Sequence, residues 1–349
     1  MQACFEKRLW QKITKISPEK CFEIALENIP NQNLLKALEF HRGKGRNDYP
    51  VCALWRELLS KLILGEQSLS IPKYAFSRFL SKLLLHQDQI LCMIEEQIRT
   101  FQKKIPLFGS TFVVQNLEQP QFYGLTDGLT SLPILIGGMQ KNSIDSIYGF
   151  LEKVQTLLPN SWYRERCLIA DQTYDDSEFC ATLWDRYRMK PVIELKENAS
   201  ISIWLKQNAC FDGNGELRCG FNQPMVYAGF EAKRDALQFR CFSKHHGIAC
   251  RFAAKCKMKK KIRVPLALNR RFITPIPRSI YKWKRLYELA SHSHYFHDFL
   301  KDFLRRNNGY SKEKKPLLSL LAITILYSLA LSFDNPTTCV LSQSRGSKG

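Results

Sequence analysis

The sequence is short of acidic residues. Its 32 Asp and Glu stand against 52 Lys and Arg, which gives a formal net charge of +20 over 349 residues. A surplus of this size predicts a polyanionic partner, although charge alone leaves DNA, RNA and an anionic membrane open. The length is sufficient for one large domain or two ordinary ones.

The N-terminus lacks the apolar stretch of a secretory signal peptide, since it reads MQACFEKRLWQK. The twelve cysteines are therefore predicted to be reduced cytosolic thiols. Only one hydrophobic run, 316–333, reaches the length of a membrane span. Three serines and a threonine interrupt this run and lysines precede it, so we expect a central helix of a large domain. The expected location is the cytoplasm, with no membrane partner.

The first hundred residues have a helical pattern. Apolar residues recur every three or four positions up to Ile105, and Pro50 and Pro72 suit helix starts. We therefore predict a helical N-terminal region over residues 1–105, with DNA contacts.

From residue 106 the pattern changes to short β-like runs, at 112–114, 132–136, 167–170 and 191–195. Helical stretches at 144–158 and 177–188 separate some of them, so the predicted class is α/β. Residues 199–263 read as an irregular inserted subdomain that contains Cys and His. Helices are expected over 279–333, which completes a core of 106–333, and 334–349 reads as a polar tail.

Two aspartates are candidates for metal-dependent chemistry. In CLIADQTYDDSEF, Asp171 follows a short apolar run, at the edge where open α/β sheets place ligands. Such a carboxylate can hold a divalent ion, or it can simply cap the following turn, with Asp175 and Asp176 capping the next helix. Asp127 precedes Gly128 between two apolar runs, which favours a hairpin turn over a catalytic role.

A long basic stretch runs from Arg251 to Arg285. It holds thirteen Lys and Arg residues and no Asp or Glu. Aromatic residues are interleaved with them, as suits nucleic-acid contact, whereas a solvated basic face is the plainer alternative. The DNA-binding candidates in it are Lys259, Lys260, Lys261, Arg263, Arg270, Arg271, Arg278, Lys282, Lys284 and Arg285.

A Cys/His cluster overlaps the start of that stretch. Cys241, Cys250 and Cys256, with either His245 or His246, could form a structural zinc knuckle. We take His246 as the candidate fourth ligand. The spacing is not that of a standard zinc finger, Cys210 and Cys219 are also near in sequence, and reduced thiols are the alternative. A zinc-binding, RNA-associated protein is a further interpretation that rests on this cluster.

Four blocks of sequence together resemble the DDE transposases of bacterial insertion sequences. The blocks are 41–84, YGLTDGLTSLPILIGG at 123–138 with the helix that follows, 168–198, and 227–250 followed by 262–288. They cover about two thirds of the chain in the family's order. The resemblance implies a ribonuclease H-like mixed-sheet core, Mg²⁺ or Mn²⁺ held by two Asp and one Glu, and strand transfer at transposon ends. It also implies that the partner is duplex DNA, both as the transposon ends and as the target. The protein would then form a homo-oligomer on DNA and be associated with the bacterial nucleoid.

The chain departs from the family pattern at two of the three acids. Phe108 and Gly109 occupy the expected place of the first Asp, and His294 occupies that of the Glu. Asp171 matches the second Asp and is the predicted Mg²⁺ ligand, while Asp127 and either Asp298 or Glu288 are the substitutes we consider for the other two. The predicted function is therefore a degenerate transposase-family protein for DNA cleavage and strand transfer. The alternative is a catalytically inactive DNA-binding remnant.

Overall fold

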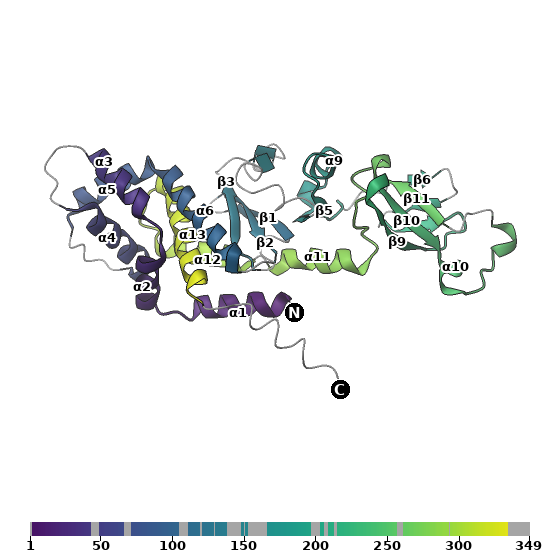
Figure 1. Ribbon diagram of the computed structural model, residues 1–349, viewed down its shortest axis with the longest axis horizontal. Coiled ribbons are helices and arrows are strands. Elements are labelled where there is room, and N and C mark those ends of the chain that lie inside the picture. Colours follow the sequence, from purple (N-terminus) through teal and green to yellow (C-terminus); the bar gives the residue numbers. More distant parts are fainter. Residues whose placement is uncertain are drawn as a thin grey trace, which may run out of the picture. The chain divides into compact units, whose positions relative to one another are not determined.

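A computed structural model of the chain shows an α/β protein (Figure 1). The residues that it describes are 2–42, 49–65, 71–104, 111–118, 121–128, 130–137, 148–149, 151–152, 166–196, 203–205, 209–212, 215–256, 261–292 and 294–333. Their contacts divide the chain into two units. Unit 1 comprises 1–109, 116–141 and 292–349, and unit 2 comprises 110–115 and 142–291.

Unit 1 is mainly helical, as the N-terminal pattern predicted. Helix α4 begins directly after Pro50 and α5 directly after Pro72, so both prolines mark helix starts, and Gly65 ends α4 with a left-handed φ of 70°. Its helices are α1 (Gln2–Thr14), α2 (Pro18–Asn28), α3 (Gln32–Arg42), α4 (Val51–Leu64), α5 (Lys73–Leu84), α6 (Gln87–Lys104), α12 (His294–Arg306) and α13 (Lys315–Ser332).

The apolar run near the C-terminus forms the central helix of unit 1. Every residue of α13 from Leu317 to Ala330 is buried, and the helix packs against α1, α2, α6 and α12. Its polar groups are satisfied inside the protein, since Gln97 Nε2 donates to Thr324 O and Ser328 Oγ. Among the described residues α13 alone is long and apolar enough to span a membrane, and 78% of that window is buried. The interpretation as a core helix is confirmed.

The turn around Asp127 joins two antiparallel strands, β2 (Gln121–Asp127) and β3 (Pro133–Gly137). The hairpin predicted from the Asp-Gly pair is therefore present. Trp10 of α1 donates from its indole Nε1 to Thr130 O, which fixes the loop against the helices of unit 1.

Unit 2 contains parallel strands. Its strands β4 (Cys167–Ala170) and β5 (Lys190–Ile193) pair in parallel, and β4 also pairs in parallel with β1 (Thr111–Glu118). The whole sheet has the order β3-β2-β1-β4-β5, and β1 contributes residues to both units. Helix α9 (Ser177–Asp185) connects β4 to β5, and α11 (Tyr281–His292) follows later in the chain. Mixed strand directions within an α/β protein agree with the predicted class.

The described residues of the segment predicted to be irregular, 199–263, instead form mainly two three-stranded antiparallel sheets. A common apolar core with Phe211, Leu237 and Phe239 supports them. The strands are β6 (Ile203–Leu205), β7 (Ala209–Phe211), β8 (Leu217–Cys219), β9 (Met225–Glu231), β10 (Ala236–Cys241) and β11 (Lys261–Pro265), with the short helix α10 (Phe242–His246) after β10.

Candidate functional site

Two carboxylates follow neighbouring parallel strands of unit 2. Asp171 comes directly after β4 and Glu194 directly after β5, and the residues before them, Ala170 and Ile193, are partners in the strand register. Adjacent strands lie about 5 Å apart, so the two backbone positions are side by side. Both residues are exposed. We call this pair the carboxylate edge. It lies at the carboxyl ends of parallel strands, where α/β sheets place ligands.

Helix α11 is tied to the carboxylate edge through Tyr287. The hydroxyl of Tyr287 donates to Glu194 Oε2 at 2.7 Å. Burial raises the pKa of Tyr287, and the hydrogen bond and charge of Glu194 and the charge of Asp171 raise it further. Tyr287 therefore remains a neutral hydrogen-bond donor, and it orients Glu194.

Asp171 also caps the turn that follows it, as the simpler interpretation predicted. It is the N-cap of a short 3₁₀ helix, Gln172–Tyr174, and its Oδ1 accepts hydrogen bonds from the amide and the hydroxyl of Thr173. Asp176 caps α9 by accepting from the amide of Phe179. The capping bonds hold the carboxylate of Asp171 in place, since they fix the orientation of its Oδ1 at the strand end.

Asp175 has a different role from the helix cap that its sequence position predicted. Its carboxylate forms a buried bidentate ion pair with Arg271, with Nε to Oδ1 at 2.7 Å and Nη2 to Oδ2 at 2.5 Å. The amide of Lys196 donates to the same carboxylate at 2.8 Å. Burial acts to raise the pKa of Asp175, but these hydrogen bonds and the nearby arginine charges hold it below its usual value.

The buried ion pair predicts an acid-sensitive fold. Because the pKa of Asp175 is lower in the folded than in the unfolded protein, its stabilisation is present above the ordinary value of 3.8 and is lost as the pH falls below it. Measured by urea denaturation, the free energy of unfolding of the wild type should therefore fall more between pH ~6 and ~3 than that of Asp175→Asn, which lacks this titrating group. Equal pH dependence in the two proteins would rule out the linkage.

Four of the predicted DNA-binding arginines make contacts within the fold. Arg271 binds Asp175, and Arg270 donates to Asp185 and Asp235 at 2.6 Å each. The buried Arg278 donates to the carbonyls of Ile193, Arg271 and Phe272, and burial lowers its pKa to about 10. Arg263 pairs with Glu231. The folded core thus uses much of the positive charge that the sequence offered for DNA.

Of the four remaining predicted cations that the structure describes, three lie on α11. Lys282, Lys284 and Arg285 are exposed along this helix, and Lys261 is exposed in β11. The opposite side of α11 packs through Trp283, Leu286, Tyr287 and Leu289 against the core of β1, β4 and β5. Lys259 and Lys260 lie outside the described residues. We call Lys282, Lys284 and Arg285 the basic face of α11.

The substitute acids lie in other settings. Asp127 is fully buried, and its Oδ2 accepts from the amide and the hydroxyl of Thr130, at 2.8 Å each. Asp298 is exposed on α12 and Glu288 is exposed on α11. His294 is also exposed, at the start of α12, and Phe108 and Gly109 lie outside the described residues.

Three of the four predicted zinc ligands line one pocket. Cys241, Cys250 and Cys256 border it, and so does Cys219, whereas His246 does not. In the part of the chain that the structure describes, no group of three or more His, Cys, Asp or Glu is arranged to hold a metal ion as it lies.

Sequence reasoning missed Glu194 and Tyr287. Glu194 carries the same signal as Asp171, an acid directly after a buried apolar run, but the β-like run predicted over 191–195 includes it within the strand, whereas β5 ends at Ile193. Tyr287 had no signal, because only the packing of α11 brings its hydroxyl to Glu194.

Comparisons of the chain with models of known protein families, with curated proteins and with solved structures find no match.

Proposed function

We propose that this protein is a transposase-family protein whose function is to bind duplex DNA through the basic face of α11. The observation that carries the proposal is that Lys282, Lys284 and Arg285 are all exposed around the solvent-facing half of a helix whose other half packs against the sheet. Cations held on a rigid element can neutralise successive phosphates without a large loss of conformational entropy. The net charge of +20 adds long-range attraction to DNA.

The strand arrangement supports the same assignment. An antiparallel β2–β3 pair beside the parallel strands β1, β4 and β5, in the order β3-β2-β1-β4-β5, fits the ribonuclease H-like core that the resemblance implies. On this proposal the partners are the ends of a bacterial insertion sequence and its target DNA, and the protein acts in the cytoplasm at the nucleoid, as a homo-oligomer on DNA.

We place DNA binding ahead of strand transfer because of the acids that the sequence lacks. Phe108, Gly109 and His294 stand where the family has its first Asp and its Glu. Asp127 is buried and bonded to Thr130, so it is not placed to reach a phosphate. Two-metal phosphoryl transfer needs several converging carboxylates.

Competition binding tests the proposal. We expect a labelled DNA duplex to bind with an affinity that falls steeply with salt, and unlabelled duplex DNA to displace it better than RNA of the same sequence. Fluorescence anisotropy at several salt concentrations measures both. Preference for RNA would refute the proposal and favour an RNA-associated protein.

Metal-dependent DNA cleavage is the second candidate function, and the carboxylate edge favours it. Asp171 and Glu194 offer the oxygen ligands that Mg²⁺ or Mn²⁺ prefers, and these two residues would hold the ion. When bound, the ion would activate the attacking oxygen. Tyr287 would keep Glu194 oriented through its hydrogen bond.

The two candidates give different results with Mn²⁺. If DNA binding is the function, a supercoiled plasmid stays intact while it is bound by wild type, Asp171→Ala and Glu194→Gln alike. If the wild type nicks the plasmid, and each of the two substitutions abolishes nicking without changing DNA binding, cleavage at the carboxylate edge is established. The matched control is Asp185→Ala, at an acid that lies outside this edge and pairs with Arg270.

A further inference from the structure

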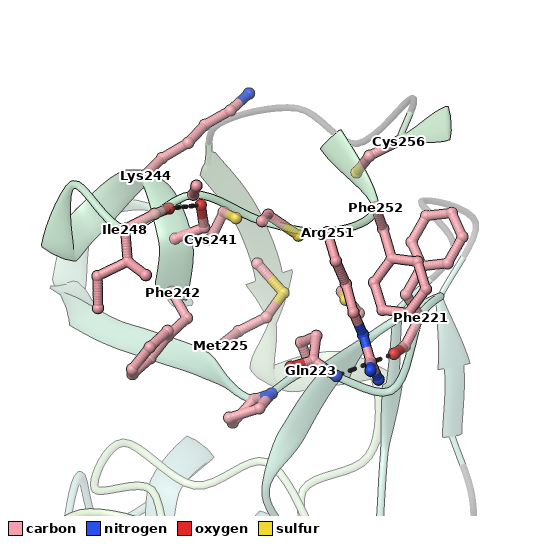
Figure 2. A pocket seen from close by; sticks show the side chains of 15 residues that line it. Phe221, Gln223, Met225, Cys241, Phe242, Lys244, Ile248, Arg251, Phe252 and Cys256 are labelled. Carbon is pink, nitrogen blue, oxygen red and sulfur yellow. Dashed lines mark hydrogen bonds between the residues drawn. The ribbon is translucent and has the colours of Figure 1, made fainter. Parts of the chain in front are cut away.

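Four cysteines from three separate parts of unit 2 line a single pocket of about 290 Å³. They are Cys219, Cys241, Cys250 and Cys256, and Met225, Phe221 and Phe252 border the same space (Figure 2). All four are reduced in the structure and partly exposed. Soft sulfur donors gathered around a space of this size form a ligand set that a thiophilic cation prefers.

The fold presents two of these thiols at strand ends. Cys219 is the last residue of β8 and Cys241 the last of β10. A tight turn follows Cys219. The amide of Cys219 donates a hydrogen bond to Gln223 O across this turn, and Asn222 in the turn has a left-handed φ of 56°. The ends of two strands that share one apolar core thus form one half of the site.

The other two thiols lie in the loop after β10. Cys250 and Cys256 flank a short 3₁₀ helix, Ala253–Lys255, whose first amide donates to Cys250 O. From Phe242 to Cys256 the segment has no buried side chain. Phe242 and Ile248 are 39% and 55% exposed, so apolar burial contributes little to its stability. The ring of Phe252 stacks on that of Phe221, with centroids 4.7 Å apart, and this contact joins the loop to the turn after β8.

We propose that Cys219, Cys241, Cys250 and Cys256 bind one structural Zn²⁺. A cation joining the two strand ends to the loop would supply the cross-link that the missing apolar core does not, as metals do in small folds. Each cysteine binds as a thiolate, so zinc uptake releases the thiol protons to solvent. The four described thiols line one pocket but do not yet lie as close together as a bound ion requires, so zinc binding would draw the loop with Cys250 and Cys256 toward the two strand ends.

This ligand set replaces the candidate His246 by Cys219. The ring of His246 packs against Phe242 with centroids 4.5 Å apart, and the residue does not line the pocket. Cys210 is a useful control, since it lies on β7 with its Sγ against Phe211 O and outside the pocket lining. The zinc proposal does not depend on DNA binding, and its failure would leave that proposal untouched.

Metal analysis of the full chain tests the site. We expect about one zinc per chain after purification, and a Co²⁺ or Cd²⁺ titration of the chelator-treated protein should give thiolate charge-transfer absorption that saturates at one equivalent. Cys219→Ser should lower zinc affinity by at least a hundredfold, beyond the roughly 10- to 100-fold effect of losing a ligand's hydrogen-bond partner. Cys210→Ser and His246→Ala should bind as the wild type does.

Three results would overturn the proposal. The first is wild-type protein without zinc and without charge-transfer absorption on addition of Cd²⁺, a measurement that needs no variant to fold. The second is loss of zinc in His246→Ala with zinc retained in Cys219→Ser, which would restore the three-cysteine, one-histidine set. The third is a disulfide among the four cysteines, detected by mass spectrometry of alkylated peptides.

Discussion

Arg271→Met is expected to destabilise the protein by about 3–5 kcal/mol, because it leaves the buried carboxylate of Asp175 without its charged partner. Asp175 is 3% exposed, and the two side chains join segments 96 positions apart in the sequence. The side chain of Asp175 is 0% exposed and that of Arg271 is 20% exposed, so it is the carboxylate that stays out of reach of water when its partner is lost. Chemical denaturation of wild type and variant measures the difference.

A double-mutant cycle separates this ion pair from general disruption. Asp175→Asn combined with Arg271→Met should cost less than the sum of the two single substitutions, because no unpaired buried charge remains. The matched control is Arg305→Met, which removes a surface arginine that is 79% exposed and pairs with Asp302. It should change stability little. Additive costs in the cycle would show that the pair is not coupled.

Charge reversal on the basic face of α11 is expected to remove most duplex DNA binding. In the triple variant Lys282→Glu, Lys284→Glu and Arg285→Glu, three phosphate contacts are lost and repulsion replaces them. The slope of log affinity against log salt should fall in magnitude by about 2.7, from 0.9 for each lost contact. Between 50 and 200 mM salt, that slope corresponds to an affinity change of about 40-fold.

The control variant carries the same change in net charge. Arg186→Glu, Lys233→Glu and Arg234→Glu reverse three exposed cations on other elements of unit 2. If the basic face is the interface, this variant keeps the wild-type salt slope and loses only the smaller long-range attraction. An equal loss in both variants would mean that net charge, rather than α11, determines binding. Circular dichroism checks that both variants remain folded.

The sequence was sufficient to predict the periodic elements. Prolines at 50 and 72 marked two helix starts, and the apolar run LIA before Asp171 marked a buried strand. These signals are local, since backbone restriction and side-chain periodicity depend on neighbouring residues. The interruption of the last apolar run by serine and threonine likewise indicated a core helix, and in α13 those hydroxyls bond to carbonyls one turn earlier.

The small sheets between residues 203 and 265 could not be predicted in this way. Strands β6, β7 and β8 have three residues each, too few to show an alternating pattern. Their stability comes from a shared core whose members, such as Trp184 and Phe272, are distant in sequence. Only long-range packing defines these strands.

The ion pairs formed by the arginines of the basic stretch could not be predicted from the sequence either. Arg251 to Arg285 reads as one basic stretch, yet Arg270 and Arg271 bind acids about 85 and 96 positions away. Composition counts charges but does not show which of them fold inward. Only the structure shows that four of the ten candidate residues, Arg263, Arg270, Arg271 and Arg278, make contacts within the fold.

Lysine acetylation footprinting tests the central claim most directly, because it locates the bound DNA on the wild-type protein, without any substitution. At saturating duplex DNA, mass spectrometry should show Lys282 and Lys284 protected from acetylation, while the exposed Lys233 reacts as it does in free protein. Unchanged labelling of Lys282 and Lys284 in the bound complex would contradict the assignment of the basic face of α11 as the DNA interface.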